Sequence, residues 1–220
     1  MVSQGFRTLS VDLPGRTRAV DPKTITLQAS AKALCAFAAT LEPPLAYVAH
    51  SQGGAVVNHA LGVCPELAVD AIVYVAAVAP LDGEKPFARL NKADETHYFE
   101  AIAYEEASGW MHIKDPQALV QHFSHKPSPR VTQGLLRGAV DEPAVIGEGK
   151  VSLNTQRFAD IRQYYVYTRF DKIVSLTSQR AIAKQLTLRD TAMLETGHVP
   201  MFSQPQALAD VIATFLSASQ

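Results

Sequence analysis

The sequence predicts an α/β fold with a mainly parallel sheet and helices on both faces. Short apolar segments alternate with segments whose apolar residues recur at helical spacing, which is the pattern of βαβ units. The segment 71–75 is apolar throughout, as expected for a strand that is buried on both faces. The last predicted helix carries an apolar stripe that can pack on the sheet, made of Leu208, Val211, Ile212, Phe215 and Leu216.

The individual elements follow in order along the chain. A first strand is predicted at residues 8–12, and it ends at the turn formed by Leu13, Pro14 and Gly15. A helix over residues 26–41 stops before Pro43, because proline disfavours helical geometry in the residue that precedes it. Further strands are predicted at 45–49, 71–75, 164–168 and 191–195, and further helices at 55–61, at 177–186 and from Ser203 onward.

Between about residues 80 and 160 the alternation of strands and helices lapses. This stretch holds the single tryptophan, several prolines and most of the histidines. We interpret it as a cap inserted over the sheet, mostly helical, with a short hairpin around 96–102 and 109–113. The predicted organisation is therefore one core, formed by residues 1–79 and 161–220, with residues 80–160 as the cap insertion.

The composition excludes several classes of protein. The 220 residues include 20 basic and 21 acidic ones, so the chain lacks the positive charge that nucleic-acid binding usually needs. No apolar stretch reaches the ~18–20 residues of a membrane span, and the first residues lack the features of a signal peptide. Cys35 and Cys64 are expected to be buried thiols. We expect a cytoplasmic enzyme-sized domain that binds neither nucleic acid nor membrane.

The stretch from Val48 to Gly54 lies directly between a predicted strand and a predicted helix. Such a sharp turn holds its serine in a strained conformation, and small residues on either side, here Ala49 and Gly53, avoid backbone clashes. Ser51 is then exposed at the carboxyl end of the sheet, beside a helix N-terminus that stabilises negative charge. His50 is expected to point away into the packing under the turn. A plain strand–turn–helix connection could carry the same glycines, so the partners of the serine decide between the two interpretations.

A nucleophilic serine needs a base, and the base needs a carboxylate that orients it. Asp171 follows the predicted strand 164–168, and His198 follows the predicted strand 191–195. Both lie at carboxyl ends of strands, so we predict that Ser51, His198 and Asp171 converge within hydrogen-bond distance. Asp160 and Asp190 precede their strands and lie at the wrong end of the sheet.

The other histidines are weaker candidates for a site. His59 lies on the predicted helix after Ser51 and is expected to be a packed or surface residue. His122 and His125 have the spacing of a metal-binding pair, but no carboxylate or cysteine is placed to complete a site. We therefore expect no metal and no cofactor.

At these residues the chain resembles the α/β-hydrolase branch that contains plant methyl-ester esterases, hydroxynitrile lyases and bacterial pyrethroid-hydrolase-like esterases. The matching stretches are 11–15, 48–54, 73–77, 171–172 with 179–180, and 197–198 with 201–205. The resemblance implies an α/β-hydrolase fold. It also implies that Ser51 is the nucleophile, His198 the general base and Asp171 its orienting acid.

Two departures from the family pattern affect the expected function. The lyases of this family carry a lysine directly after the catalytic histidine, and Val199 stands there in this chain, which favours ester hydrolysis. The family also opens with a strand ending in His-Gly and a helix, and that loop supplies one of the two oxyanion donors. This sequence starts with what resembles the end of that helix. We expect an N-terminally short core, either a gap in the sheet or an unusual re-pairing of two central strands, and weak esterase activity.

The sequence thus predicts a serine carboxylesterase that cleaves a small-molecule ester through an acyl-enzyme, with the Gln52 N–H holding the oxyanion. Trp110, Phe99 and Phe123 are loosely placed candidates for the lining of an apolar pocket, although for any one of them a place in the core of the cap is favoured. One alternative is a non-catalytic or weakly active α/β-hydrolase-fold protein that binds a ligand, and a remoter one is a lyase of the same fold. A homodimer is one way to cover the gap in the sheet.

Overall fold

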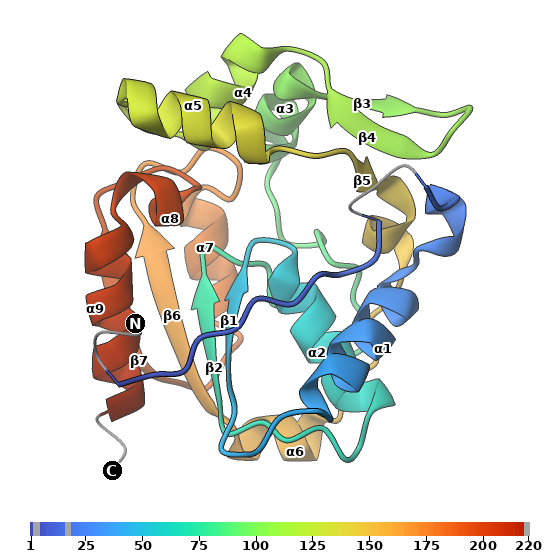
Figure 1. Cartoon of the computed structure of the whole chain (residues 1–220), viewed down its shortest axis with the longest axis vertical. Coiled ribbons are helices and arrows are strands. Elements are labelled where there is room, and N and C mark those ends of the chain that lie inside the picture. The colour runs from blue at the N-terminus through green and yellow to red at the C-terminus, as the bar shows by residue number, and fades with distance from the viewer. Residues whose placement is uncertain (2–4, 16–18, 218–220) are drawn as a thin grey trace.

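A four-stranded parallel sheet lies at the centre of the computed structural model, which describes residues 1, 5–15 and 19–217 (Figure 1). The order of the strands is β1-β2-β6-β7, and each neighbouring pair is parallel. The two inner strands, β2 and β6, are buried along most of their length because both of their neighbours and both faces of the sheet are covered. The strands are β1 (Ala46–His50), β2 (Ala71–Val75), β6 (Arg162–Thr168) and β7 (Leu188–Leu194).

Helices cover both faces of the sheet. Successive side chains of a strand point to opposite faces, so Tyr74 and Tyr165 belong to the cluster that α1, α2 and α7 cover. Val75 and Tyr164 lie on the other face, under α9, where Tyr164 stacks on Phe215. The helices of this core are α1 (Leu27–Ala38), α2 (Gly53–Val63), α6 (Thr155–Asp160), α7 (Leu176–Ala183), α8 (Pro200–Ser203) and α9 (Pro205–Ser217).

The predicted strands from residue 45 onward are confirmed to within a few residues, but the strand predicted at 8–12 is wrong. Residues 8–12 form no strand, and nearly all of them are exposed. Within the described residues β1 pairs on one side only, with β2, and 49% of the surface of Val48 is exposed. Strand preference depends strongly on a partner, and the local pattern of residues 8–12 cannot supply one.

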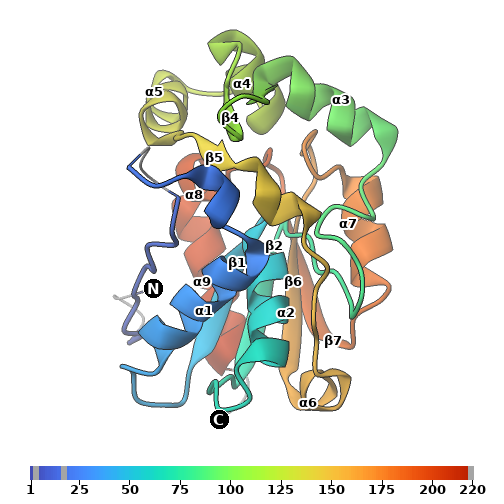
Figure 2. The same cartoon turned by 90° about the vertical axis from the view of Figure 1, so that its right-hand side faces the viewer.

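The segment between β2 and β6 contains the elements that lie above the carboxyl end of the sheet (Figure 2). The hairpin predicted around 96–102 and 109–113 begins later than expected, because residues 92–101 continue as a helix whose first turn is capped by the Asn91 side chain. The elements are η2 (Pro22–Thr24) from the N-terminal part, and α3 (Lys92–Ala101), β3 (Ile102–Glu105), β4 (Trp110–Ile113), α4 (Pro116–Phe123), α5 (Pro129–Gly138), β5 (Glu142–Pro143) and η3 (Ala144–Glu148).

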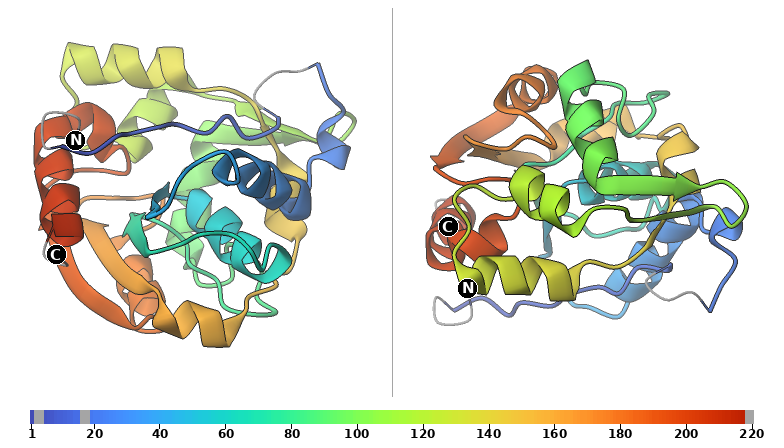
Figure 3. Two further views of the ribbon diagram at one scale, coloured as in Figure 1. Left: turned by 60° about the horizontal axis from the view of Figure 1, so that its bottom comes forward. Right: turned by 90° about the horizontal axis from the view of Figure 1, so that it is seen from above.

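These upper elements, which we call the cap, have an apolar cluster of their own. Ala101, Leu119 and Leu135 form its centre, and seen from above the helices and the hairpin spread over the sheet (Figure 3). The C-terminal end of the predicted insertion 80–160 departs from this arrangement, because Val151 and Phe158 pack in the main core instead. In the described part of the chain, no helix has the length and apolar character needed to cross a membrane.

A disulfide bond joins Cys35 of α1 to Cys64, which ends α2. The expectation of two buried thiols is therefore wrong. The bond depends on the side-by-side packing of α1 and α2, which brings the two Cα atoms to 6.4 Å. That approach is a tertiary contact between residues 29 positions apart, and neither local sequence contains a signal for it.

Removal of this disulfide should lower the stability of the fold. For a closed loop of about 29 residues, loss of the crosslink costs about 3–4 kcal/mol in the free energy of unfolding, because the unfolded chain gains freedom. We expect the double variant Cys35→Ala with Cys64→Ala to unfold at a lower urea concentration than the native chain. The control is the reduced native protein, which should match the variant. Two free thiols in a titration of the unreduced protein would contradict the assignment.

Candidate active site

Ser51 occupies a strained turn between β1 and α2. Its φ angle is 52°, in the left-handed region that costs free energy for any residue except glycine. Two contacts with the chain after β2 hold it there. The Ser51 N–H donates to the Val75 carbonyl at 3.3 Å, and the Ser51 carbonyl accepts from the Val78 N–H at 3.1 Å. The turn therefore presents the hydroxyl above the end of β1.

The second glycine of the motif, Gly54, is the one that the turn requires sterically. A Cβ at this position would lie 2.0 Å from the Val78 carbonyl oxygen, whereas a Cβ at Gly53 would meet nothing within 4 Å. The close approach of α2 to the chain after β2 thus depends on Gly54.

The structure brings Ser51, His198 and Asp171 together as predicted. His198 Nε2 lies 2.9 Å from Ser51 Oγ, and His198 Nδ1 lies 2.8 Å from Asp171 Oδ2. The His198 and Asp171 side chains are 3% and 0% exposed. Because a carboxylate only accepts hydrogen bonds, Nδ1 carries the proton, and the lone pair of Nε2 faces the serine hydroxyl. This arrangement can take a proton from Ser51.

Asp171 is held by four hydrogen bonds in total. Its Oδ1 accepts from the backbone N–H groups of Ile173 and Val174, at 2.8 and 2.9 Å. Its Oδ2 accepts from Thr168 Oγ1 at 2.9 Å in addition to His198. A buried carboxylate is stable only when its oxygens are paired in this way. The side chain of Asp171 is therefore fully hydrogen-bonded and fixed in direction.

Gln179 supports this loop from below and was not among the predicted site residues. It is fully buried in α7, where its Oε1 accepts from the Thr168 N–H and its Nε2 donates to the Val174 carbonyl. The two ends of the loop that carries Asp171 are thereby joined through one side chain. A glutamine on the core-facing side of the predicted helix 177–186 is the signal that could have found it.

His50 does not point away from the site, so that expectation is wrong. Its ring lies 4.7 Å from the His198 ring, and its Nε2 lies 2.7 Å from the His198 carbonyl oxygen. Burial and, to a smaller extent, the neighbouring His198 together lower the pKa of His50 to about 3. The ring is therefore neutral near pH 7.

The backbone N–H of Gln52, the predicted oxyanion donor, precedes the first turn of α2. In the part of the chain that the structure describes, it donates to no acceptor. Gln52 also lines the cavity above Ser51. A backbone N–H without an acceptor at the start of a helix, in a residue that lines a cavity, is suited to bind negative charge.

The remaining candidates from the sequence lie outside this cluster. Asp160 ends α6 at the opposite end of β6, and Asp190 is exposed in β7. His59 is paired with Gln28. His122 pairs with Glu100, and His125 stacks on Phe170. Among the described residues no group of three or more potential metal-binding side chains is gathered.

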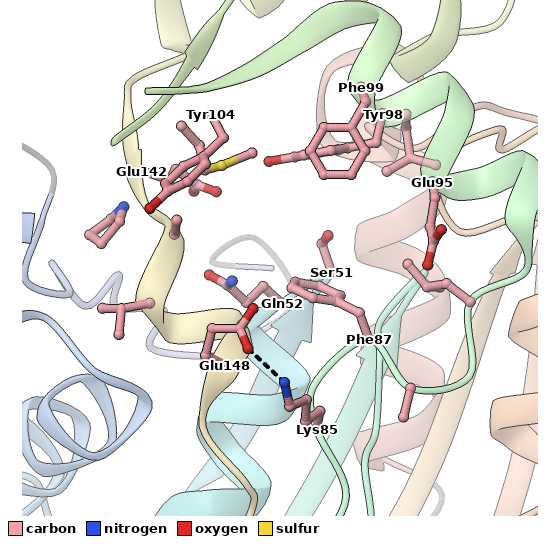
Figure 4. A pocket seen from close by; sticks show the side chains of 18 of the residues that line it. Ser51, Gln52, Lys85, Phe87, Glu95, Tyr98, Phe99, Tyr104, Glu142 and Glu148 are labelled. Carbon is pink, nitrogen blue, oxygen red and sulfur yellow. Dashed lines mark hydrogen bonds and ion pairs between the residues drawn. The ribbon is translucent and has the colours of Figure 1, made fainter. Parts of the chain in front are cut away.

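A cavity of about 1010 Å³ lies between the sheet and the cap, with Ser51 and Gln52 at its base (Figure 4). Tyr98 and Phe99 of α3 enter it from above. The wall is mostly apolar with a few charged groups, a composition typical of small-molecule sites. Its other lining side chains include Lys23, Lys85, Phe87, Leu90, Glu95, Tyr104, Met111, Glu142, Glu148, Ile173 and Val174.

The three aromatic residues predicted to line a pocket have different positions. Phe99 lines the cavity. Trp110 does not, because successive side chains of β4 point to opposite faces and Met111 takes the cavity side while Trp110 is buried. Phe123 is also outside the lining, and it packs its edge on the His198 ring, with centroids 5.6 Å apart. Of these three aromatic residues, Phe99 alone therefore lines this cavity.

Tyr98 offers a hydroxyl to the cavity. Its side chain points inward from α3 (Figure 4). Burial raises the pKa of Tyr98, and the carboxylate of Glu142 raises it further. The phenol therefore remains protonated at neutral pH and can donate a hydrogen bond to a ligand.

Comparison with known proteins connects this geometry to a family. The sequence matches the alpha/beta hydrolase family over residues 2–211. A protein of Arabidopsis thaliana named "Putative methylesterase 14, chloroplastic" is 26% identical over 225 residues, which cover 94% of this chain and 63% of that protein. The chain thus spans less than two thirds of that relative. "Probable hydrolase R7" of a Phoma species is 27% identical, over 95% of this chain and 86% of the relative.

Solved structures share the fold. A pyrethroid hydrolase from Sphingobium faniae JZ-2 superposes with a TM-score of 0.80 at 18% identity, over 99% of this chain and 89% of that one. Polyneuridine aldehyde esterase gives a TM-score of 0.79 at 18% identity, over 100% and 90% of the two chains. At these identities the likeness establishes the fold.

The lowered pKa of the partly buried His50 should make the protein sensitive to acid. Below about pH 6.5 the unfolded chain binds a proton at His50, while the folded chain does not until about pH 3. The free energy of unfolding is therefore unaffected by this group above pH 6.5. Between pH 6.5 and about pH 3 it falls by about 1.4 kcal/mol for each pH unit.

Urea unfolding at pH 7.5 and pH 5.0 measures this effect. Between the two pH values, we expect the native chain to lose about 2 kcal/mol more than the variant His50→Gln, which has no titrating group at this position. Burial also lowers the pKa values of His59 and His122, but both residues are present in both proteins. An equal loss in the two proteins would show that His50 is not responsible.

Proposed function

This chain belongs to the alpha/beta hydrolase family, and we propose that it is a serine hydrolase that cleaves a small carboxylic ester. The observation that supports the proposal is the hydrogen-bonded series Ser51–His198–Asp171, with distances of 2.9 and 2.8 Å, at the base of a cavity. A serine in a strained turn, a histidine aligned on it and a buried carboxylate are the groups that nucleophilic catalysis requires.

In the proposed reaction the Ser51 hydroxyl attacks the carbonyl carbon of the ester. His198 Nε2 takes the hydroxyl proton as the bond from Oγ to carbon forms, and Asp171 stabilises the imidazolium that results. The four hydrogen bonds on Asp171 hold it in a fixed direction toward His198. His198 then gives the proton to the departing alcohol oxygen, which leaves an acyl group on Ser51.

Water completes the cycle. His198 removes a proton from a water molecule, the hydroxide attacks the acyl carbon, and the proton passes to Ser51 Oγ as the acid is released. Each tetrahedral intermediate carries a negative oxygen, for which the free N–H of Gln52 is the donor in place. One such donor typically contributes a factor of about 10²–10³ in turnover.

The lining of the cavity favours an apolar ester that carries a ring on one side of its carbonyl group. Phe87, Tyr98 and Phe99 offer aromatic surface, and the protonated Tyr98 hydroxyl offers one donor. Relatives of this chain are named methylesterases, so methyl esters of aromatic or cyclic carboxylic acids are the first substrates to test. Val199, which follows His198, is buried in the apolar cluster of the cap and supplies no cation for a lyase reaction.

The central test is ester hydrolysis by the purified chain with a chromogenic short-chain ester. We expect Ser51→Ala to lower kcat by at least about 10³-fold and Asp171→Asn to lower it substantially, because members of such a group act as a unit. The exposed Ser152 provides the control, since Ser152→Ala should leave kcat unchanged. Turnover that survives Ser51→Ala, or a folded native chain that binds esters without any turnover, would refute the proposal and favour a ligand-binding role.

Phe99 should determine the affinity for aromatic esters. Its side chain contacts the cavity from α3, and loss of the ring removes about 1.5 kcal/mol of apolar contact, equivalent to about a 10-fold increase in KM. We expect Phe99→Ala to show this increase for an aryl ester and little change for an acetate ester. Phe202, a similarly exposed ring of α8 that does not line the cavity, gives the control variant Phe202→Ala. Equal KM changes in the two variants would contradict the assignment.

A further inference from the structure

One partly buried titratable group next to the nucleophile has no part in the proposed reaction. His50 ends β1 and directly precedes Ser51. Its Nε2 lies 2.7 Å from the backbone carbonyl oxygen of His198, and the two rings are 4.7 Å apart with an interplanar angle of 46°. The side chain of His50 therefore contacts both the backbone and the ring of His198, the proposed base for Ser51.

The hydrogen bond defines the protonation of His50. A carbonyl oxygen can only accept, so the Nε2 of His50 carries the proton and donates it. Burial keeps the ring neutral, with the pKa lowered to about 3. A neutral ring matters here, because a cation at this distance would oppose the positive charge that His198 gains when it takes a proton from Ser51.

The contact between His50 and His198 joins two segments whose strands are not neighbours in the sheet. Ser51 follows β1 and His198 follows β7, and these strands lie at opposite edges of the sheet. No ladder of backbone hydrogen bonds connects them. Apart from the Ser51–His198 bond itself, the His50 bond is the one hydrogen bond between residues 50–52 and 195–199 in the described part of the chain.

The other contacts of the His198 loop hold it to different elements. The Thr196 carbonyl accepts from the Phe170 N–H, and the Glu195 carbonyl accepts from the Gln204 side chain. Asp171 orients the ring through Nδ1. These contacts fix the loop relative to β6 and α8, and the His50 bond is the one that joins the backbone of His198 to the residue beside Ser51.

We propose that His50 is a positioning residue, whose hydrogen bond to the His198 carbonyl sets the distance between His198 Nε2 and Ser51 Oγ. The proposal rests on the proposed esterase function for its kinetic consequence, but the contact itself can be measured without turnover. A displacement of about 1 Å between reacting groups can cost about 100-fold in rate. The effect belongs in kcat, because His50 does not line the cavity and so does not contact substrate.

Three variants separate positioning from simple support of the fold. His50→Leu fills the site without a donor, while His50→Gln keeps a donor at the place of Nε2. We expect His50→Leu to lower kcat about 10- to 100-fold with KM changed less than about 2-fold, and His50→Gln to recover most of the loss. His59→Gln is the control, because His59 is a hydrogen-bonded histidine of the same region that faces α1 and the 152 loop instead of His198.

Histidine-selective ¹⁵N NMR provides a readout that needs no ester turnover. We expect His50 to be the neutral Nε2–H tautomer at pH 7, and the His198 signals to shift in His50→Leu but not in His59→Gln. If His50→Leu does not fold, His50→Asn replaces it, since its shorter amide cannot reach the His198 carbonyl. Thermal unfolding establishes that each variant compared is folded.

The outcomes distinguish the two proposals. Native-like kcat and unchanged His198 signals in His50→Leu would overturn the positioning role. So would a loss of kcat in His50→Gln as large as that in His50→Leu. A loss of that size in the control His59→Gln would overturn it as well. If the native chain shows no Ser51-dependent turnover, the proposed function fails. The NMR comparison alone then decides whether His50 positions His198.

Discussion

The hydrogen bond between Ser51 and His198 connects the two edges of the sheet, and the geometry of the site depends on it. β1 and β7 are separated by β2 and β6, so a 2.9 Å contact between the residues that follow them requires both turns to reach over the carboxyl end of the inner strands. Parallel strands place these ends on one side. The left-handed turn at Ser51 and the loop of His198 then bring the side chains together.

Complete hydrogen bonding of the polar groups explains why Asp171 and His198 can be buried. Asp171 would carry a large desolvation cost as an isolated charge, yet each of its oxygens accepts two hydrogen bonds. Gln179 continues the network into the core through Thr168 and Val174. In a medium of low dielectric such a network is stabilising only when it is complete. The same network therefore contributes to the fold and orients His198.

The cap and the His198 loop are packed as one unit. Val199, next to His198, lies in the apolar cluster of the cap with Leu119 and Leu135, and Phe123 of α4 packs on the His198 ring. Tyr98 and Phe99 on the neighbouring α3 line the cavity above Ser51. The helix that carries two lining residues of the cavity therefore packs on the same apolar cluster as Val199, next to His198.

The sequence by itself determined the local features: the Ser51 turn, the parallel strand pattern, and the positions of Asp171 and His198 after their strands. These follow from spacing over a few residues, where periodicity and turn chemistry act. Only the tertiary structure decided which segments meet. Residues 8–12 have strand-like composition but no partner, Cys35 and Cys64 pair because α1 packs on α2, and His50 turns toward His198. Each of these outcomes depends on contacts between residues distant in the chain, and a local pattern holds no information about them.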